Sequence, residues 1–406
     1  MPNDITHEGS IGSRLRAARR ERGMTQEALA ERAGVSLDVI SDLERERREA
    51  ARISTLTLLA DALGVTLSAL LDRRERLERE QPAGVLAVRD ALLSVSDLPG
   101  VDPGDGDGEP AAPAALAALV RGGWDLYWAG RLSELAGMLP GLIGEARLAR
   151  GQSGPAAAAP LAQSYQLAAD LLVHTGNDDL AMVAAERALA AAAAGDDELQ
   201  HAVLCGTASW VLLHQGRAAD AERVALAAAQ KIEPRMSTAA PAHLTVWGSL
   251  LLSAAAPAAA ASRADSAEEY LGLARSAAVR FEADRHDYWT SFGPTQVAMQ
   301  ACYANSVLGR PGKALKAARG VRRENLLDIS WGAHHLDVAQ ALACDGRADR
   351  DRQAAEALGV AHSVSAEWFR HQGLARSLTR ELADRRRRLG EPLATLMASI
   401  GGPEGR

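Results

Sequence analysis

The sequence predicts an all-α protein in which a small N-terminal helical domain precedes a long array of helical pairs. Aromatic residues make up only 4% of the chain and alanine is abundant, which favours helices packed through small side chains over sheets. At 406 residues the chain is too long for a single core and indicates two domains or more. From residue 112 onward, one turn signal recurs between apolar stretches, as expected for repeated helical units.

Residues 25–44 carry the most specific pattern, that of two short helices joined by a tight turn. Thr25 is a suitable N-cap for the first helix, and Gly34 supplies the left-handed residue that ends it. Ser36 can cap the second helix. So tight a turn makes the second helix project from the surface, in a shape that fits a DNA major groove. The inner face of this second helix carries Val39, Ile40 and Leu43.

Further helices are expected on both sides of this pair, over residues 11–23, 53–63 and 66–71. With five helical segments in this order, residues 10–72 resemble the lambda/Cro-like (Xre) repressor domain. The resemblance implies a five-helix DNA-binding domain over residues 1–72 that binds a double-stranded operator. It also implies a homodimer, because such domains read two half-sites. The inward-facing residues of the last two helices are Leu56, Leu59, Ala60, Leu63, Leu67 and Leu70.

The outer face of the second helix of this motif is expected to meet DNA. By position in the matching helix, Leu37, Asp38 and Asp42 fall where the repressor family presents base-reading side chains, and Gln26 falls where it clamps a phosphate. Carboxylates depart from the amides and guanidiniums of the family: they accept a hydrogen bond from cytosine but repel phosphate. A second interpretation is that Asp42 orients Arg45 or Arg47. The whole outer face comprises Leu37, Asp38, Ser41, Asp42 and Arg45, and Ser36 at the start of the helix is a further DNA-binding candidate.

Phosphate contacts are expected from arginines, because the net charge of −7 gives no global attraction to nucleic acid. The strongest candidates follow the second helix of the motif, and a second group lies on the first helix of the domain. The alternative is a solvated face in which these charges are balanced by Glu44, Glu46 and Glu49. The candidates are Arg45, Arg47, Arg48 and Arg52, then Arg14, Arg16, Arg19 and Arg20.

Residues 73–111 are expected to connect two domains. The run 72–81 is highly charged and can prolong a helix, and residues 84–93 predict a short amphipathic helix. The Gly, Asp and Pro residues of 99–110 favour neither helix nor strand. This last segment is therefore interpreted as a linker that lets the two halves shift relative to each other.

The array is predicted from glycines that each end a helix before a polar residue. They lie roughly forty residues apart, with one interval about twice as long, where a worn turn is expected at residues 262–265. A two-helix repeat of this length predicts a solenoid of about six pairs over residues 112–362, closed by a polar capping helix over 368–389. The glycines are Gly130, Gly176, Gly216, Gly309 and Gly346.

One copy of the repeat, residues 210–234, resembles the tetratricopeptide pattern of aromatic, leucine, glycine, alanine and closing proline. We therefore expect residues 112–406 to form a tetratricopeptide-like sensor and dimerisation domain. An Xre-like domain followed by such an array resembles actinobacterial regulators, and also peptide-sensing regulators of Gram-positive bacteria. The stretches 287–297 and 334–339 are similar to signatures of the actinobacterial class.

A stacked helical array has a concave groove, which can hold a peptide, a partner helix or a small molecule. The chain has few helical asparagines of the kind that grip a peptide backbone, so a small molecule or partner protein is favoured over a peptide effector. Ordinary packing between helices is the alternative role for the same aromatic residues. The candidate effector residues are Tyr288, Trp289, Phe292, Tyr303, His334, His335 and Asp337.

No enzyme motif, metal site or cofactor site is expected. Cys205, Cys302 and Cys344 have no metal-ligand spacing, and neither His201 with Cys205 nor His334 with His335 has a third ligand in the sequence. No secretory signal opens the chain, and the apolar run 244–261 is interrupted by proline, so we expect a cytoplasmic protein without a membrane span.

The sequence therefore predicts a sequence-specific transcriptional regulator whose helical array senses an effector and mediates dimerisation. The chief alternative is a non-catalytic interaction scaffold in which the helix-turn-helix serves only for docking. The acidic outer face of the recognition helix is what keeps this alternative open.

Overall fold

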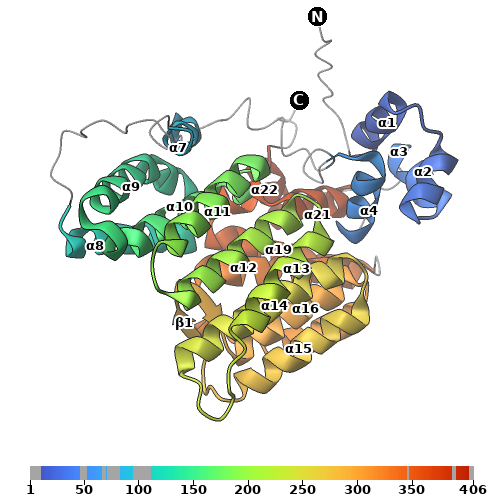
Figure 1. Cartoon of the computed structure of the whole chain (residues 1–406). Coiled ribbons are helices and arrows are strands. Elements are labelled where there is room, and N and C mark those ends of the chain that lie inside the picture. The colour runs from blue at the N-terminus through green and yellow to red at the C-terminus, as the bar shows by residue number, and fades with distance from the viewer. Residues whose placement is uncertain are drawn as a thin grey trace, which may run out of the picture.

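The structure, a computed structural model, describes residues 11–45, 53–65, 70, 83–94, 111–344, 347–385 and 390–401. This part of the chain is all-α apart from one two-stranded hairpin, which confirms the predicted fold class. Figure 1 shows the N-terminal helices, in blue, beside a larger array whose colour runs from green to red.

The N-terminal unit contains α1 (Ile11–Glu21), α2 (Gln26–Ala33), α3 (Leu37–Glu44) and α4 (Ile53–Leu63). A Cβ on Gly12 would lie 1.7 Å from the Leu43 carbonyl oxygen, so glycine allows α1 to approach α3 closely. The predicted fifth helix lies outside the described residues except for Leu70, which is buried in the same core. That core is formed chiefly by Leu15, Leu29, Ile40, Leu43, Leu59 and Leu63.

Six helical pairs make the array, as the repeat predicted. The first helices of the pairs contact one another in sequence, and α18 also contacts α8, so these first helices form a closed inner ring. The second helices pack outside it. The pairs are α8 (Pro113–Trp128) and α9 (Leu132–Ser153), α10 (Ala158–His174) and α11 (Asp178–Ala193), α12 (Glu198–His214) and α13 (Ala218–Lys231), α14 (Pro241–Ala260) and α15 (Ala264–Ala278), α16 (Pro294–Val307) and α17 (Pro311–Ala318), α18 (Asp328–Ala343) and α19 (Ala348–Val364).

The turns inside the pairs follow the predicted glycine pattern. Gly130, Gly176, Gly216 and Gly309 all have positive φ, the left-handed conformation in which glycine pays no steric penalty. Ser262 takes the corresponding conformation, with φ 61°, between α14 and α15. The prediction of a worn turn at 262–265 is therefore confirmed, and Gly346 lies outside the described residues.

The C-terminal helices join the two ends of the array. Ser365 Oγ donates to the Gly130 carbonyl at 2.8 Å, and the Ser133 backbone N–H donates to Glu367 at 2.7 Å. The predicted single capping helix over 368–389 is wrong. The helix is interrupted at Gln372, where the backbone is extended, and Trp368 is buried. The helices are α20 (Ala366–His371), α21 (Gly373–Asp384) and α22 (Glu391–Ser399), with residues 386–389 outside the described residues.

Between α15 and α16 the chain forms a hairpin that the sequence did not predict. Strands β1 (Arg285–Asp287) and β2 (Thr290–Phe292) pair antiparallel around a two-residue turn. The turn residues Tyr288 and Trp289 have φ of 54° and 61°. Bulky side chains rarely adopt this conformation, so the tip of the hairpin is strained. Short 3₁₀ turns also occur at Gly154–Ala157 and Arg323–Asn325.

Two further segments pack on the array. Helix α7 (Ala83–Leu92) lies within the predicted connector and buries Val85 and Val88 against α9, while residues 71–82 and 95–110 lie outside the described residues. Within the described chain, α14 is the one helix long and apolar enough to cross a membrane. Its apolar window is 72% buried inside the array, as expected of a core helix.

Candidate DNA interface and effector groove

Helix α3 is positioned by the turn that precedes it. Thr25 caps α2 by accepting a hydrogen bond from the Ala28 N–H at 3.1 Å, and Gly34 ends α2 with φ 65°. Ser36 occupies the N-cap position of α3 with an extended backbone, but its side chain makes no capping hydrogen bond. The predicted helix-turn-helix is thus present, with the Ser36 side chain exposed.

The C-terminal end of α3 is fixed by a buried carboxylate, Glu44, which is 3% exposed. Arg19 donates two hydrogen bonds to it, at 2.6 and 2.8 Å, and Gln26 Nε2 donates a third at 2.7 Å. Arg16 adds an ion pair at 3.5 Å. Burial alone raises the pKa of Glu44, but the hydrogen bonds and these positive charges outweigh it and lower the pKa below its usual value. This cluster ties α1, α2 and α3 together.

The Glu44 cluster corrects two expectations. Gln26 is half-buried and its amide nitrogen donates to Glu44, so it helps to hold α3, and its contact with a phosphate stays a prediction. Arg19 is buried, and its guanidinium also donates to the Met24 carbonyl, so it is a structural residue. Glu44 does not lie on a solvated face either. Sequence reasoning missed its role because its partners lie 18 and 25 residues away along the chain.

The outer face of α3 remains accessible. Leu37 is 40% exposed, Asp38 and Arg45 are exposed, and Ser41 and Asp42 are half-buried. Within the described residues, Asp42 and Arg45 form no ion pair, and Arg47, Arg48 and Arg52 lie outside them. This face offers carboxylates for cytosine amino groups and a leucine for a thymine methyl.

Two of the other first-helix arginines also serve the fold. Arg14 donates to the Leu70 carbonyl at 3.0 Å, and Arg16 bonds to the Glu44 carbonyl. Arg20 is exposed. Among the predicted phosphate candidates that the structure describes, Arg20 and Arg45 are the exposed ones, and their contact with phosphate stays a prediction.

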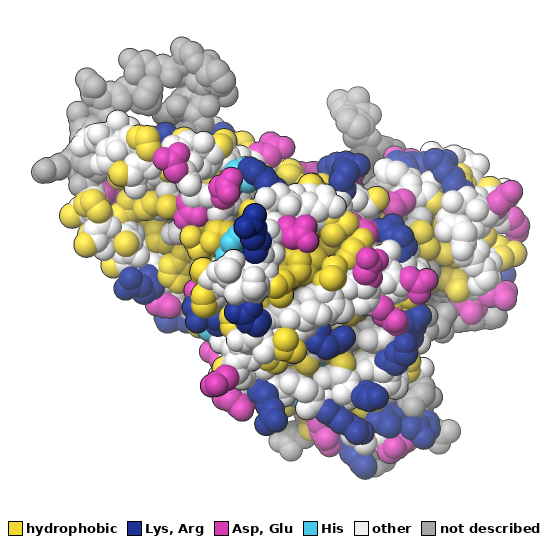
Figure 2. Space-filling model, turned by 60° about the horizontal axis from the view of Figure 1, so that its bottom comes forward, with side chains coloured by type: hydrophobic (Ala, Val, Ile, Leu, Met, Phe, Trp, Pro, Cys, Tyr) yellow, Lys and Arg dark blue, Asp and Glu magenta, His cyan; other side chains and the backbone are white. Residues whose placement is uncertain are grey.

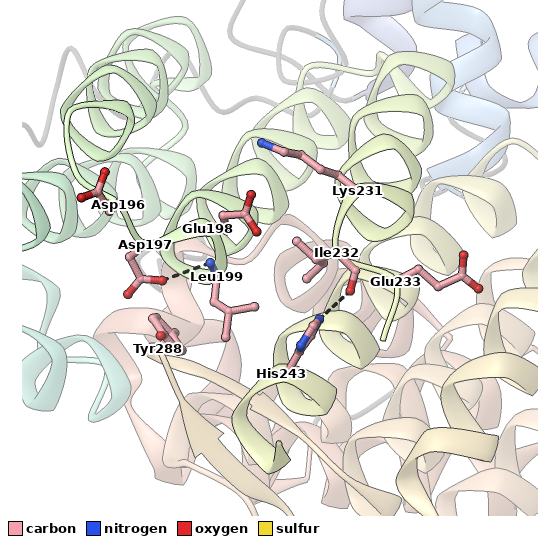
Figure 3. A pocket seen from close by; sticks show the side chains of 9 residues that line it. All are labelled: Asp196, Asp197, Glu198, Leu199, Lys231, Ile232, Glu233, His243 and Tyr288. Carbon is pink, nitrogen blue, oxygen red and sulfur yellow. Dashed lines mark hydrogen bonds between the residues drawn. The ribbon is translucent and has the colours of Figure 1, made fainter. Parts of the chain in front are cut away.

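The predicted effector residues do not line one pocket. Phe292 is fully buried against Gly248 and Phe281, so its placement at a pocket wall is wrong. Tyr288 and Trp289, adjacent at the hairpin tip, line two different hollows. Figure 3 shows the hollow that contains Tyr288, which has a volume of about 580 Å³ and exposed carboxylates at the start of α12.

Tyr303, His334, His335 and Asp337 lie on the inner helices α16 and α18. Burial raises the pKa of Asp337 well above its usual value, and burial with the nearby Asp337 charge raises the pKa of Tyr303. Burial lowers the pKa of both histidines to about 4, so they are neutral at pH 7. No group of three metal-ligating side chains occurs in the described part of the chain.

The hollow that contains Trp289 lies where α8, α10, α12 and α14 meet the hairpin. It has a volume of about 150 Å³ and is walled by four tryptophans, Trp124, Trp128, Trp210 and Trp289. We call it the tryptophan hollow. Trp289 stacks on Trp124 with ring centroids 5.6 Å apart and planes 7° apart. The hairpin therefore completes the aromatic wall across the inner ring.

Asp170, on α10, is the one charged residue that lines the tryptophan hollow. It is 7% exposed, has no hydrogen bond or ion pair to another described residue, and burial raises its pKa to about 8. Sequence reasoning missed Asp170. The available signal was a single carboxylate in the apolar stretch 167–173.

A helix-turn-helix family model matches residues 15–70. A transcriptional regulator, y4dJ, of Sinorhizobium fredii is 48% identical over 56 residues, 14% of this chain and 71% of its own. SinR of Bacillus subtilis is 32% identical over 87 residues, 21% of this chain and 78% of its own. The immunity repressor of Bacillus phage phi105 is 39% identical over 72 residues, 18% of this chain but only 49% of its own.

Among solved structures, Bacillus thuringiensis PlcR in complex with the peptide PapR7 and DNA matches with a TM-score of 0.38 and 13% identity, over 77% of this chain and 92% of its own. A PrgX mutant matches with a TM-score of 0.28 and 10% identity, over 95% and 99%. Similarities this weak carry no functional argument. The sequence relatives, over 30% identical and covered for two thirds or more of their length, show that this chain belongs to the helix-turn-helix family of DNA-binding transcriptional regulators.

Proposed function

We propose that the chain is a cytoplasmic homodimer that reads an operator through α3 and is controlled by an effector bound inside the helical array. The observation that carries this proposal is the tryptophan hollow, which combines aromatic walls with a buried carboxyl that has no hydrogen-bond or ion-pair partner in the described part of the chain. A few polar groups among aromatic walls are typical of ligand sites.

Helix α14 connects the tryptophan hollow to the N-terminal unit. It lines the tryptophan hollow with Ser249, Leu250 and Ser253, and it also contacts α4 of the N-terminal unit. A ligand that shifts α14 changes the support of the helix-turn-helix. Such control requires the ligand to bind the DNA-competent and incompetent arrangements with different affinity.

Two half-sites are read when two α3 helices lie about one DNA turn, roughly 34 Å, apart. Light scattering of the purified protein tests the homodimer directly. A monomer at the concentrations that bind DNA would contradict this part of the proposal.

The DNA-binding proposal is tested by gel shifts with genomic fragments from upstream of the gene, at fixed and stated salt. We expect one fragment to be bound roughly a thousand-fold more tightly than bulk duplex. Equal affinity for all duplexes favours the rival function, a non-catalytic scaffold that docks protein partners. The observation behind that rival is the pair of carboxylates, Asp38 and Asp42, on the outer face of α3.

A further inference from the structure

Four tryptophan rings make up much of the lining of the tryptophan hollow. Trp124 stacks with Trp289 at 5.6 Å and lies 6.1 Å from Trp128 at an angle of 24°, and Trp210 completes the wall from α12. Faces of aromatic rings carry negative potential and attract cations, tryptophan most strongly. A ring face that is open to the hollow thus favours positive charge on a ligand.

The unpartnered acceptors of the hollow point to the same charge, whereas Trp124 Nε1, a buried N–H donor without a partner in the described residues, requires an acceptor on the ligand. Among the described residues that line it there is no lysine, arginine or histidine, and Asp170 is 93% buried, since its exposure is 7%. Gln166 Oε1 is also buried without a hydrogen-bond partner within the described residues. A buried carboxyl and a free amide oxygen are acceptors that an ammonium group satisfies, whereas an anion satisfies neither.

We propose that the tryptophan hollow binds an organic cation, a protonated or quaternary amine, with Asp170 as its counter-ion and the tryptophans as its walls. The assignment rests on the proposed effector-sensing function and names the chemical class of the effector. An adjoining hollow of about 220 Å³ shares Trp210, Ser249 and Ser253, and it offers room for the uncharged part of the ligand.

The hairpin supplies the fourth tryptophan of the hollow, Trp289, from a turn whose backbone is strained. Tyr288 and Trp289 both have left-handed backbone conformations, which persist only where surrounding contacts enforce them. Those contacts exist: Thr245 donates to Asp287 at 2.8 Å, and Asp284 accepts the first N–H groups of α16, from Thr295 and Gln296, at 2.8 Å each. Strained tips of this kind cluster at ligand sites.

The larger hollow of Figure 3 is a weaker candidate for the same cation. Its carboxylates, Asp196, Asp197, Glu198 and Glu233, are exposed to solvent, and Lys231 competes for them within the same hollow. Exposed carboxylates are hydrated already and gain little from a weakly held cation. The buried Asp170 gains much more.

The test compares three probes of nearly equal shape: 2-phenylethylammonium, neutral 2-phenylethanol and anionic phenylacetate. Titration of the full-length protein is followed by tryptophan fluorescence and calorimetry. We expect the cation to bind at least roughly ten-fold more tightly than the other two. Equal affinity of the three probes, or no binding of the cation at millimolar concentration, overturns the proposal.

Variants locate the site. Asp170→Asn keeps the shape of the side chain and is expected to reduce cation affinity roughly ten-fold, as is Trp289→Ala. Asp125→Asn, which makes the same change at an exposed carboxylate of α8 that does not line the hollow, is the matched control and should leave affinity unchanged. Circular dichroism checks that each variant is folded. Unchanged affinity in folded Asp170→Asn overturns the assignment.

Gel shifts with and without the cation separate this inference from the proposed function. Cation binding that changes operator affinity in the wild type but not in Asp170→Asn supports both. Cation binding that leaves operator affinity unchanged supports the site and overturns its sensing role. Operator binding together with equal affinity for all three probes keeps the regulator and overturns the cation site.

Discussion

The N-terminal unit and the helical array each bury a carboxylate, and the surroundings of the two differ. Glu44 is 3% exposed and accepts hydrogen bonds from Arg19 and Gln26, and its pKa is lowered. Asp170 is 7% exposed and has no hydrogen-bond or ion-pair partner among the described residues, and its pKa is raised to about 8. Burial alone therefore does not assign a role. A buried carboxylate that is paired supports the fold, and one that lacks a partner and also lines a hollow is a candidate for ligand binding.

The largest expected effect comes from removing the bidentate ion-pair partner of Glu44, a kind of partner that Asp170 lacks in the part of the chain that the structure describes. Arg19→Ala leaves the carboxylate buried without its bidentate partner, which should cost the N-terminal unit about 3–5 kcal/mol. All 7 tryptophans lie in the array, so circular dichroism should show an early transition that tryptophan fluorescence does not. Arg20→Ala, on the exposed face of α1, is the control and should change neither signal.

The two carboxylates should also give opposite pH dependence. The pKa of Glu44 is lowered on folding, so its contribution to stability is present above about pH 4.3, the unfolded value, and is lost at lower pH. The pKa of Asp170 is raised, so its contribution is greatest below about pH 4 and is lost as the pH rises toward about 8.

Unfolding followed by tryptophan fluorescence between pH 5 and 8 measures how the stability of the array, which contains Asp170, depends on pH. Asp170 should make stability fall with rising pH by at most about 1.4 kcal/mol per unit. Asp170→Asn should remove that share of the slope, while the raised pKa of the buried Asp337 contributes a slope of the same sign in both proteins. The control is the exposed Asp125→Asn, for which we expect the wild-type slope. A wild-type slope in Asp170→Asn would show that the carboxyl is satisfied.

The sequence predicts those parts of the fold that depend on local chemistry. Helix caps and turns depend on the residues next to them, as at Thr25, Gly34 and the turn glycines. The repeat period also located the turn at Ser262, although no glycine marks it in the sequence. What it misses depends on contacts between distant residues. The Glu44 cluster spans 25 residues, the closure of the array through Ser365 spans 235, and the hairpin puts two aromatic residues into a conformation that local preference opposes.

Arginines in the N-terminal unit also differ in whether the protein itself supplies their partners. Arg19 is held by the protein, whereas Arg45 is exposed beside α3 and available for phosphate. Arg45→Ala with Arg48→Ala should weaken binding to all duplexes and reduce the salt slope by about 2, because each phosphate contact contributes about 0.9. Arg121→Ala, exposed on α8 of the array, is the control. An unchanged slope in the double variant would remove these residues from the interface.

The smallest expected effect concerns the turns. Four of the described pair turns place glycine in the left-handed conformation and one places Ser262 there, whereas the hairpin places Tyr288 there. Asn adopts that conformation more readily, so Tyr288→Asn should stabilise the array by up to about 1 kcal/mol, as measured by urea unfolding followed by tryptophan fluorescence. Destabilisation would show instead that the contacts of the Tyr288 ring outweigh the backbone strain.

The contrast between Glu44 and Asp170 is tested most directly by the protonation state of Asp170 in the ligand-free protein. An infrared difference spectrum between wild type and Asp170→Asn at pH 7 isolates this one group. The raised pKa of Asp170, about 8, predicts the carbonyl band of a protonated carboxylic acid, and its conversion to a carboxylate band when 2-phenylethylammonium is added. A carboxylate band before any cation is present would contradict the account, because it would mean that the protein already satisfies Asp170.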